Sequence, residues 1–431
     1  MFKEEIKDYG LDIFVPNLIT DLSGFIFIGL VSFVILTTAS RWPSTYNFIL
    51  AALSLRIIVI IIGHYFVHLP DTTADALGYE WGAWNMAKDG FFNVFHIFTG
   101  PNSRFYSWLM AIPYSLFGRN ILIIQSIGLF FGVASVFLGW LLAREIWGDR
   151  SAIKVGWILA LFPSLILYSV ITLKEVYCSF FILMAMFGAA RWGKTKNFGP
   201  ACLSMGSFFI AGFFHGPLFL GGFIFSIFFC ISIFKISFKS LLAYRINLKN
   251  FIVIFLILSI LIAFLNNEIY LPYIGTFEGA TDMKRLMENI SNRLVGNASY
   301  PEWLIVEMPT EFFYKGFARI FYFLFYPFPW TINQPIHLIG ALDSLLYMVL
   351  TILIIFNFKL IWNDPSLRII LVIFLFYLFI YGIGVSNFGA GIRHRSKFII
   401  EMVILAAPII PKLIFSKKIK LKKNYKFKKI K

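Results

Sequence analysis

Long, uninterrupted apolar stretches recur along the whole chain, and short polar turns separate them. FIVIFLILSILIAFL (251–265) and IILVIFLFYLFIYGIG (369–384) are typical. Continuous apolarity of this length is the pattern of membrane-crossing helices, whereas a transmembrane β-barrel shows short segments in which apolar and polar residues alternate. The pattern therefore predicts an all-α polytopic membrane protein.

The apolar stretches divide into about eleven expected transmembrane helices. They lie at 22–38, 47–67, 121–144, 152–172, 175–191, 198–215, 217–234, 249–266, 336–357, 367–384 and 396–414. Two further apolar pieces, 104–118 and 316–330, do not fit as crossings, because counting either would put a basic loop on the wrong side of the membrane. We interpret both as interfacial or re-entrant helices on the outer face, where tyrosine and tryptophan rings favour the headgroup region.

Composition and charge narrow this picture. A hydrophobic content of 59% with 14% charged residues is too apolar for a water-soluble fold. The net charge is +16, and the last twenty residues contain ten lysines and no acid. Such a segment is typical of a cytoplasmic tail held near anionic lipid. It is too short for a nucleic-acid-binding module to fold there. We therefore expect one transmembrane domain, 1–415, with outer loops 69–120 and 267–335, followed by a basic cytoplasmic tail, 416–431. Arg56, inside the second span, is most simply a side chain that reaches toward the cytoplasmic surface.

The longest polar interruption in the first two hundred residues is DTTADALGYEWGAWNMAKDG, 71–90, which the topology places outside. Asp75 and Tyr79 are four residues apart and would share one face of a short helix. Alanines and tryptophans make that helix apolar enough to lie on the membrane. A carboxylate held there can act as a general base on a hydroxyl group, while a purely structural or solvated acid is the alternative.

Other polar residues fall on the same predicted face. Glu175 and His215 each lie where one span turns directly into the next. Residues 389–398, GAGIRHRSKF, place Arg393 and Arg395 outside, against the positive-inside tendency. Guanidinium groups beside glycines suit a phosphate or diphosphate, and non-specific contact with lipid headgroups is the alternative.

The order of these motifs resembles the GT-C superfamily of polyprenyl-phosphate-dependent glycosyltransferases, which includes protein mannosyltransferases and aminoarabinose transferases. In the first outer loop, the family's aspartate and tyrosine match Asp75 and Tyr79, followed by Ala83 and Gly90. Five other segments follow in the family's order, over roughly residues 45–415: YSLFG (114–118), LLAREIWGDRSA (141–152), ILALFPSLILYS (158–169), LFYPFPW (324–330) and RHRSKFIIEMVILAAP (393–408).

The resemblance implies a GT-C-like bundle and a hexosyl- or pentosyltransferase. Such an enzyme moves a sugar from a polyprenyl-phosphate or diphosphate donor to an acceptor hydroxyl on a lipid, glycan or protein at the outer face, with inversion. Asp75 would be the general base, and Glu175 would orient the acceptor or Asp75. Donor phosphate would be bound by Arg393, Arg395 and His394. Residues expected around the acceptor cleft are Tyr79, Asp71, Glu80 and His215.

This chain departs from the family pattern in ways that leave alternatives open. Ala76 follows Asp75 where the family often has a second acid, so Asp71 competes as the base. No cofactor is certain, and metal use, including a divalent cation at Glu175, stays unknown. A polysaccharide polymerase of the O-antigen type and a flippase or transporter are the rival functions. The expected location is a bacterial or archaeal plasma membrane with the site facing outward. The sugar, the acceptor, the orientation of the N-terminus and the oligomeric state stay open.

Overall fold

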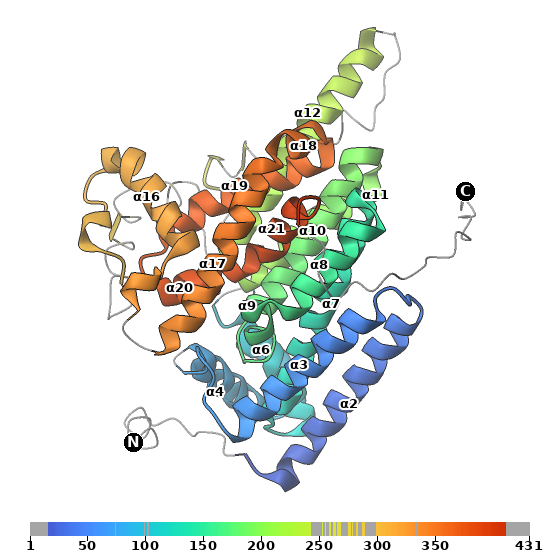
Figure 1. Cartoon of the computed structure of the whole chain (residues 1–431), viewed down its shortest axis with the longest axis vertical. Coiled ribbons are helices and arrows are strands. Elements are labelled where there is room, and N and C mark those ends of the chain that lie inside the picture. The colour runs from blue at the N-terminus through green and yellow to red at the C-terminus, as the bar shows by residue number, and fades with distance from the viewer. Residues whose placement is uncertain are drawn as a thin grey trace.

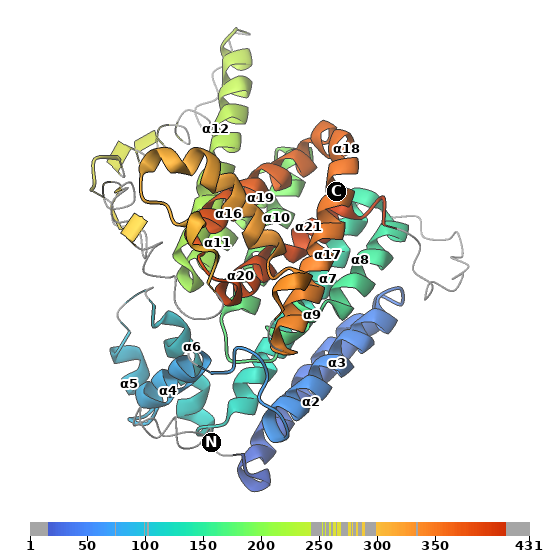
Figure 2. The ribbon, with the colours of Figure 1, turned by 60° about the vertical axis from the view of Figure 1, so that its left-hand side comes forward.

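The computed structural model describes residues 16–242 apart from 74, 99, 101 and 102, scattered positions between 252 and 288, and residues 299–410 apart from 333 and 334. The described elements are all helices (Figures 1 and 2). Those before residue 243 are α2 (Leu18–Ser40), α3 (Tyr46–Tyr65), α4 (Asp75–Ala87), α5 (Phe91–His96), α6 (Phe105–Phe117), α7 (Ile121–Trp147), α8 (Asp149–Leu161), α9 (Pro163–Leu167), α10 (Glu175–Thr195), α11 (Phe198–Phe214), η1 (Gly216–Leu218) and α12 (Phe219–Leu242). Those after residue 299 are η2 (Glu302–Leu304), η3 (Pro309–Glu311), α16 (Phe312–Phe325), η4 (Pro329–Thr331), α17 (Pro335–Phe356), α18 (Phe358–Asn363), α19 (Pro365–Gly384), α20 (Phe388–Arg395), η5 (Ser396–Phe398) and α21 (Ile399–Ala406).

Six helical stretches among the described residues are long and apolar enough to cross a membrane. They are α2, α3, α7, α10, the η1–α12 stretch Gly216–Phe238 and α19. Two shorter apolar helices are Phe198–Phe214 and Gly340–Phe356. The chain is thus an all-α protein with membrane-spanning helices, as the apolar pattern predicted. The count of eleven spans stays a prediction, and the expected span 249–266 and the tail 416–431 lie largely or wholly outside the described residues.

The expected span 152–172 is two helices rather than one. Helix α8 ends at Leu161, Phe162 is extended with φ −68° and ψ 122°, and α9 begins at Pro163. Proline has no backbone N–H and disfavours helical geometry in the residue before it, so the break follows from the sequence FPS. The break frees carbonyl groups in the last turn of α8, and a charged side chain binds one of them.

That side chain is Arg56, in the middle of α3. It is fully buried, and its Nε atom donates to Oγ of Ser169 at 2.9 Å while its Nη1 atom donates to the carbonyl of Ala160 at 3.2 Å. The expectation that Arg56 reaches toward the cytoplasmic surface was wrong. A buried guanidinium needs acceptors, and the interrupted helix supplies one of them, the Ala160 carbonyl.

Close packing places the turn that leads into α10. A Cβ atom on Gly128 would lie 2.8 Å from the carbonyl oxygen of Ser169, and one on Gly132 would lie 2.4 Å from the Ser169 side chain. Glycine at both positions of α7 lets the backbone around Ser169 approach that helix. The turn then delivers Glu175, the first residue of α10, to one end of the bundle.

The polar loops collect at that same end. Helix α4 packs against α5 and α6, and in Figures 1 and 2 this group lies below the main bundle, with α20 between it and α16. At the far end of α10, Arg191 pairs with Glu145 at 2.9 Å and Lys194 donates to the Glu145 carbonyl at 3.1 Å. Because Arg191 and Lys194 follow Glu175 by 16 and 19 residues in α10, these basic groups lie about 24 and 28 Å along the helix from Glu175, close to the thickness of a bilayer core.

Candidate functional site

Two acids and two cations from three distant parts of the chain meet at one end of the bundle. Nη1 of Arg393 lies 2.6 Å from Oδ2 of Asp75, and Nε of Arg393 lies 3.2 Å from Oε1 of Glu175. Nζ of Lys397 lies 3.8 Å from the same Glu175 oxygen. Asp75 and Arg393 are 318 positions apart in the chain. We call Asp75, Glu175, Arg393 and Lys397 the acid–arginine cluster.

Three of its members, Asp75, Glu175 and Arg393, lie at helix ends. Asp75 begins α4 and Glu175 begins α10, where the partial positive charge of the helix N-terminus favours a carboxylate. Helix α20 is capped by Asn387, whose side chain accepts a hydrogen bond from the Ala390 N–H at 2.8 Å. Arg393 lies in the last turn of α20, where a cation is favoured for the same electrostatic reason.

The cluster runs from solvent into the protein. The Asp75 side chain is 53% exposed, Arg393 is 20% exposed and Glu175 is 1% exposed. Burial alone would lower the pKa of Arg393, but the charges of Glu175 and Asp75 outweigh it and raise that pKa above its ordinary value. Arg393 therefore stays cationic and holds one buried and one exposed acid.

Two histidines border the cluster. The Lys397 ammonium donates to Nδ1 of His394 at 2.8 Å. Burial and the Lys397 charge lower the pKa of His394 well below its usual value, so its imidazole is neutral and can accept that bond. Nδ1 of His215 lies 2.9 Å from the Tyr381 hydroxyl, and the ring centroids of His215 and His394 are 5.2 Å apart. The structure thus places His394 against Lys397, and His215 beside His394.

Asp71 lies on another side of the site. The Tyr168 hydroxyl donates to Oδ2 of Asp71 at 2.7 Å. Asp71 has a φ of 59°, a left-handed conformation that few residues other than glycine adopt and that marks stored backbone strain. Burial raises the pKa of Asp71, against the opposing effects of the Tyr168 hydrogen bond and the Arg393 charge.

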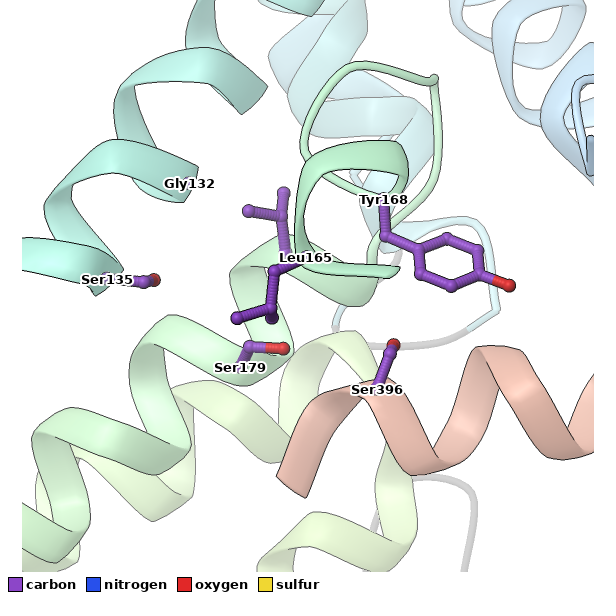
Figure 3. Close-up of a pocket in the computed structure, with 7 residues that line it drawn as sticks. Gly132, Ser135, Leu165, Tyr168, Ser179 and Ser396 are labelled. Atoms are coloured by element: carbon purple, nitrogen blue, oxygen red, sulfur yellow. The ribbon is translucent and has the colours of Figure 1, made fainter. Parts of the chain in front are cut away.

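A small cavity extends inward from Tyr168 (Figure 3). Ser135, Ser179 and Ser396 are among the residues that line it, and in Figure 3 the Tyr168 hydroxyl points away from these three serines. Ser179 is one turn along α10 from Glu175, and Ser396 directly follows α20. The cavity has room for roughly one water molecule, which is too little for a sugar or a phosphate group.

Tyr79 lies next to the acid–arginine cluster and contacts Tyr106 and Lys174. Its ring packs edge-to-face on Tyr106 with centroids 5.3 Å apart. Nζ of Lys174 lies 5.4 Å from the centroid of the Tyr79 ring, within the range of a cation–π contact. Lys174 precedes Glu175 and is itself buried, so this contact ties α4 to the start of α10.

Arg395 was expected to bind the donor phosphate, but in the structure its side chain is directed away from Asp75. Its side chain is 1% exposed. Nη1 of Arg395 donates to the carbonyls of Leu324 at 2.8 Å and Tyr326 at 3.0 Å, and Nη2 lies 3.3 Å from Oδ2 of Asp343. Arg395 therefore binds the carbonyl groups freed at the end of α16.

Glu80 was expected in the acceptor cleft, but it lies on the buried face of α4. Its two oxygens accept from Nε and Nη2 of Arg119 at 2.9 and 2.8 Å, and the Tyr114 hydroxyl donates to it at 3.1 Å. This paired geometry fastens α4 to the start of α7 and to α6. Glu80 faces the interior of the α4–α6 group, away from Arg393.

Sequence reasoning left three participants without a role: Lys174, Lys397 and Tyr168. Lys397 lies four residues after Arg393 and Lys174 adjoins Glu175, so their proximity to predicted site residues was a usable signal. Tyr168 carried no such signal, because its position depends on the turn that follows the break at Pro163.

The described residues contain no group of three or more His, Cys, Asp or Glu side chains close enough to hold a metal ion. No protein-family model and no curated protein matches the chain. The resemblance to the GT-C superfamily therefore rests on the order of the motifs alone.

Proposed function

We propose that this protein is an integral-membrane glycosyltransferase that moves a sugar from a polyprenyl-phosphate or diphosphate donor to an acceptor hydroxyl at the outer face of the membrane. The observation that carries the proposal is the contact of Asp75 with Arg393. An exposed carboxylate and an anion-binding guanidinium stand side by side, and transfer from a phosphate-linked sugar needs these two groups.

The acceptor oxygen would attack the anomeric carbon of the donor sugar. The bond between that carbon and the phosphate oxygen breaks, and the leaving phosphate keeps the bonding electron pair. Asp75 takes the proton of the acceptor hydroxyl. The acceptor oxygen attacks from the face opposite the phosphate, and this direction of attack inverts the configuration of the anomeric carbon. Arg393 stabilises the negative charge that develops on the leaving phosphate.

Glu175 and Lys397 have positioning roles in this scheme. Glu175 is buried 3.2 Å from Nε of Arg393, and its charge would hold the guanidinium at the site. A buried carboxylate needs a compensating charge, and Lys397 supplies a second cation, so Arg393 can also serve an external anion. Tyr79 would pack against the acceptor, since its partly buried ring borders Asp75 on α4.

Helix α16 supports a membrane-surface location for the site. Phe313, Phe317 and Phe321 recur every four residues along it and are 81%, 76% and 49% exposed. An aromatic stripe of this kind lies in the interfacial region of a bilayer. Because α16 also packs on α20, it would hold Arg393 near the depth at which a lipid-linked phosphate lies.

The test is sugar transfer by purified protein in lipid nanodiscs. A panel of polyprenyl-phosphate hexoses and pentoses is supplied with a membrane extract as acceptor, and release of polyprenyl phosphate is measured. Asp75→Asn should lower the rate by about 100-fold or more. Asp89→Asn, at an exposed acid of the same loop, is the matched control and should leave it unchanged. Full activity of a folded Asp75→Asn protein would refute the assignment.

A further inference from the structure

Arg393 holds two carboxylates that differ in how easily an external anion can replace them. Glu175 is almost completely buried, and Lys397 is its second cation. Moving it away from Arg393 would leave a buried charge poorly compensated, which is costly. Asp75 is half exposed, and an exposed ion pair of this kind is weak, because water solvates the separated carboxylate well.

The hydrogen bond between Arg393 and Asp75 also conflicts with the role of Asp75 as a base. Oδ2 of Asp75 accepts from Nη1 of Arg393 at 2.6 Å. That oxygen is directed at the guanidinium rather than at an acceptor hydroxyl, which a general base must reach within hydrogen-bond distance. A phosphate group offers Arg393 two oxygens in the fork geometry that a guanidinium prefers, so it can compete for the edge of Arg393 that Asp75 occupies.

We propose that Arg393 exchanges anions during the catalytic cycle. Before donor binds, Arg393 holds Asp75. The phosphate of the lipid-linked donor then displaces the Asp75 carboxylate, while Glu175 stays in place, and Asp75 becomes free to accept the proton of the acceptor. This inference rests on the proposed function. It makes donor binding precede activation of the base, so the acceptor is not activated at an empty site.

The exchange has a consequence that a simple binding role for Arg393 lacks. Asp75 competes with the phosphate, so removing its charge should strengthen phosphate binding while abolishing transfer. Wild-type protein, Asp75→Asn, Asp75→Ser, Arg393→Gln and the control Asp89→Asn are placed in nanodiscs of phosphatidylcholine. Binding of a short-chain polyprenyl monophosphate without sugar is then measured by calorimetry.

Both Asp75 variants should bind this probe about fivefold more tightly than wild type. Arg393→Gln should bind at least about tenfold more weakly, and Asp89→Asn should match wild type. Equal or weaker binding by folded Asp75→Asn and Asp75→Ser overturns the exchange, as does the absence of binding by wild type and both variants.

Two further probes identify the source of the phosphate. Inorganic phosphate should compete only weakly with the polyprenyl probe, and adding phosphatidylglycerol to the nanodiscs should leave the fivefold difference in place. Equal competition by either one would overturn the assignment to a lipid-linked donor. If the Asp75 variants bind more tightly but no sugar is ever transferred, the proposed function fails and the exchange stands. If sugar is transferred and Asp75→Asn binds no more tightly, the exchange fails and the transferase stands.

Discussion

Replacing Arg395 should destabilise the protein without changing its affinity for a phosphate lipid. Arg395→Met removes the hydrogen bonds to Leu324, Tyr326 and Ser344 and leaves the buried Asp343 carboxylate without its cation. Breaking a buried ion pair from one side typically costs about 3–5 kcal/mol. Asp75→Asn removes a half-exposed partner and should cost at most about 1 kcal/mol.

The measurement is unfolding in mixed micelles by titration with denaturing detergent, followed by tryptophan fluorescence. The double variant Arg395→Met with Asp343→Asn tests the cause, because it removes the uncompensated carboxylate and should recover a large part of the loss. The reasoning is refuted if Arg395→Met unfolds with the wild-type midpoint but no longer binds polyprenyl phosphate. In that case Arg395 would belong to the phosphate site.

Two more predictions concern pH and topology. Burial raises the pKa of the Asp71 carboxyl in the folded protein. Wild-type stability should therefore fall as the pH rises from the usual carboxyl range through the raised pKa, and Asp71→Asn should lack this decline. A stability difference between the two proteins that does not change with pH contradicts the assignment. In a background without Cys178, Cys202 and Cys230, Asp89→Cys should react with an impermeant maleimide on intact cells and Arg150→Cys only after lysis, while the reverse pattern would invert the predicted topology.

Much of the helical architecture could be predicted from the apolar pattern, because a bilayer requires long apolar helices. The expected spans at 22–38, 121–144 and 175–191 fall within α2, α7 and α10. Charge placement went further. Glu175 was predicted on the outer face, and basic residues favour the opposite, cytoplasmic side; Arg191 and Lys194 lie at the far end of α10 from Glu175.

The site was harder to predict at the level of individual side chains. Asp75 and Arg393 were assigned to one face, and the structure brings them together. Arg395 carries the same chemistry two residues later, but its direction depends on carbonyl groups at the end of α16, which no local pattern reveals. Glu80 did carry a signal, because it recurs at helical spacing with the buried Ala76, Ala83 and Ala87. Local spacing thus indicates which face a residue occupies, whereas the tertiary partner decides what it does.

The most direct test of the account is an experimental structure of the protein in nanodiscs with a non-hydrolysable polyprenyl-phosphate sugar. We predict phosphate density within hydrogen-bond distance of the Arg393 guanidinium, Glu175 unmoved, and the Asp75 carboxylate released from Arg393 and directed at the sugar. Phosphate density bound to Arg395 or at the Arg191 end of the bundle would contradict the account, and so would an Asp75–Arg393 pair that stays intact with the donor bound.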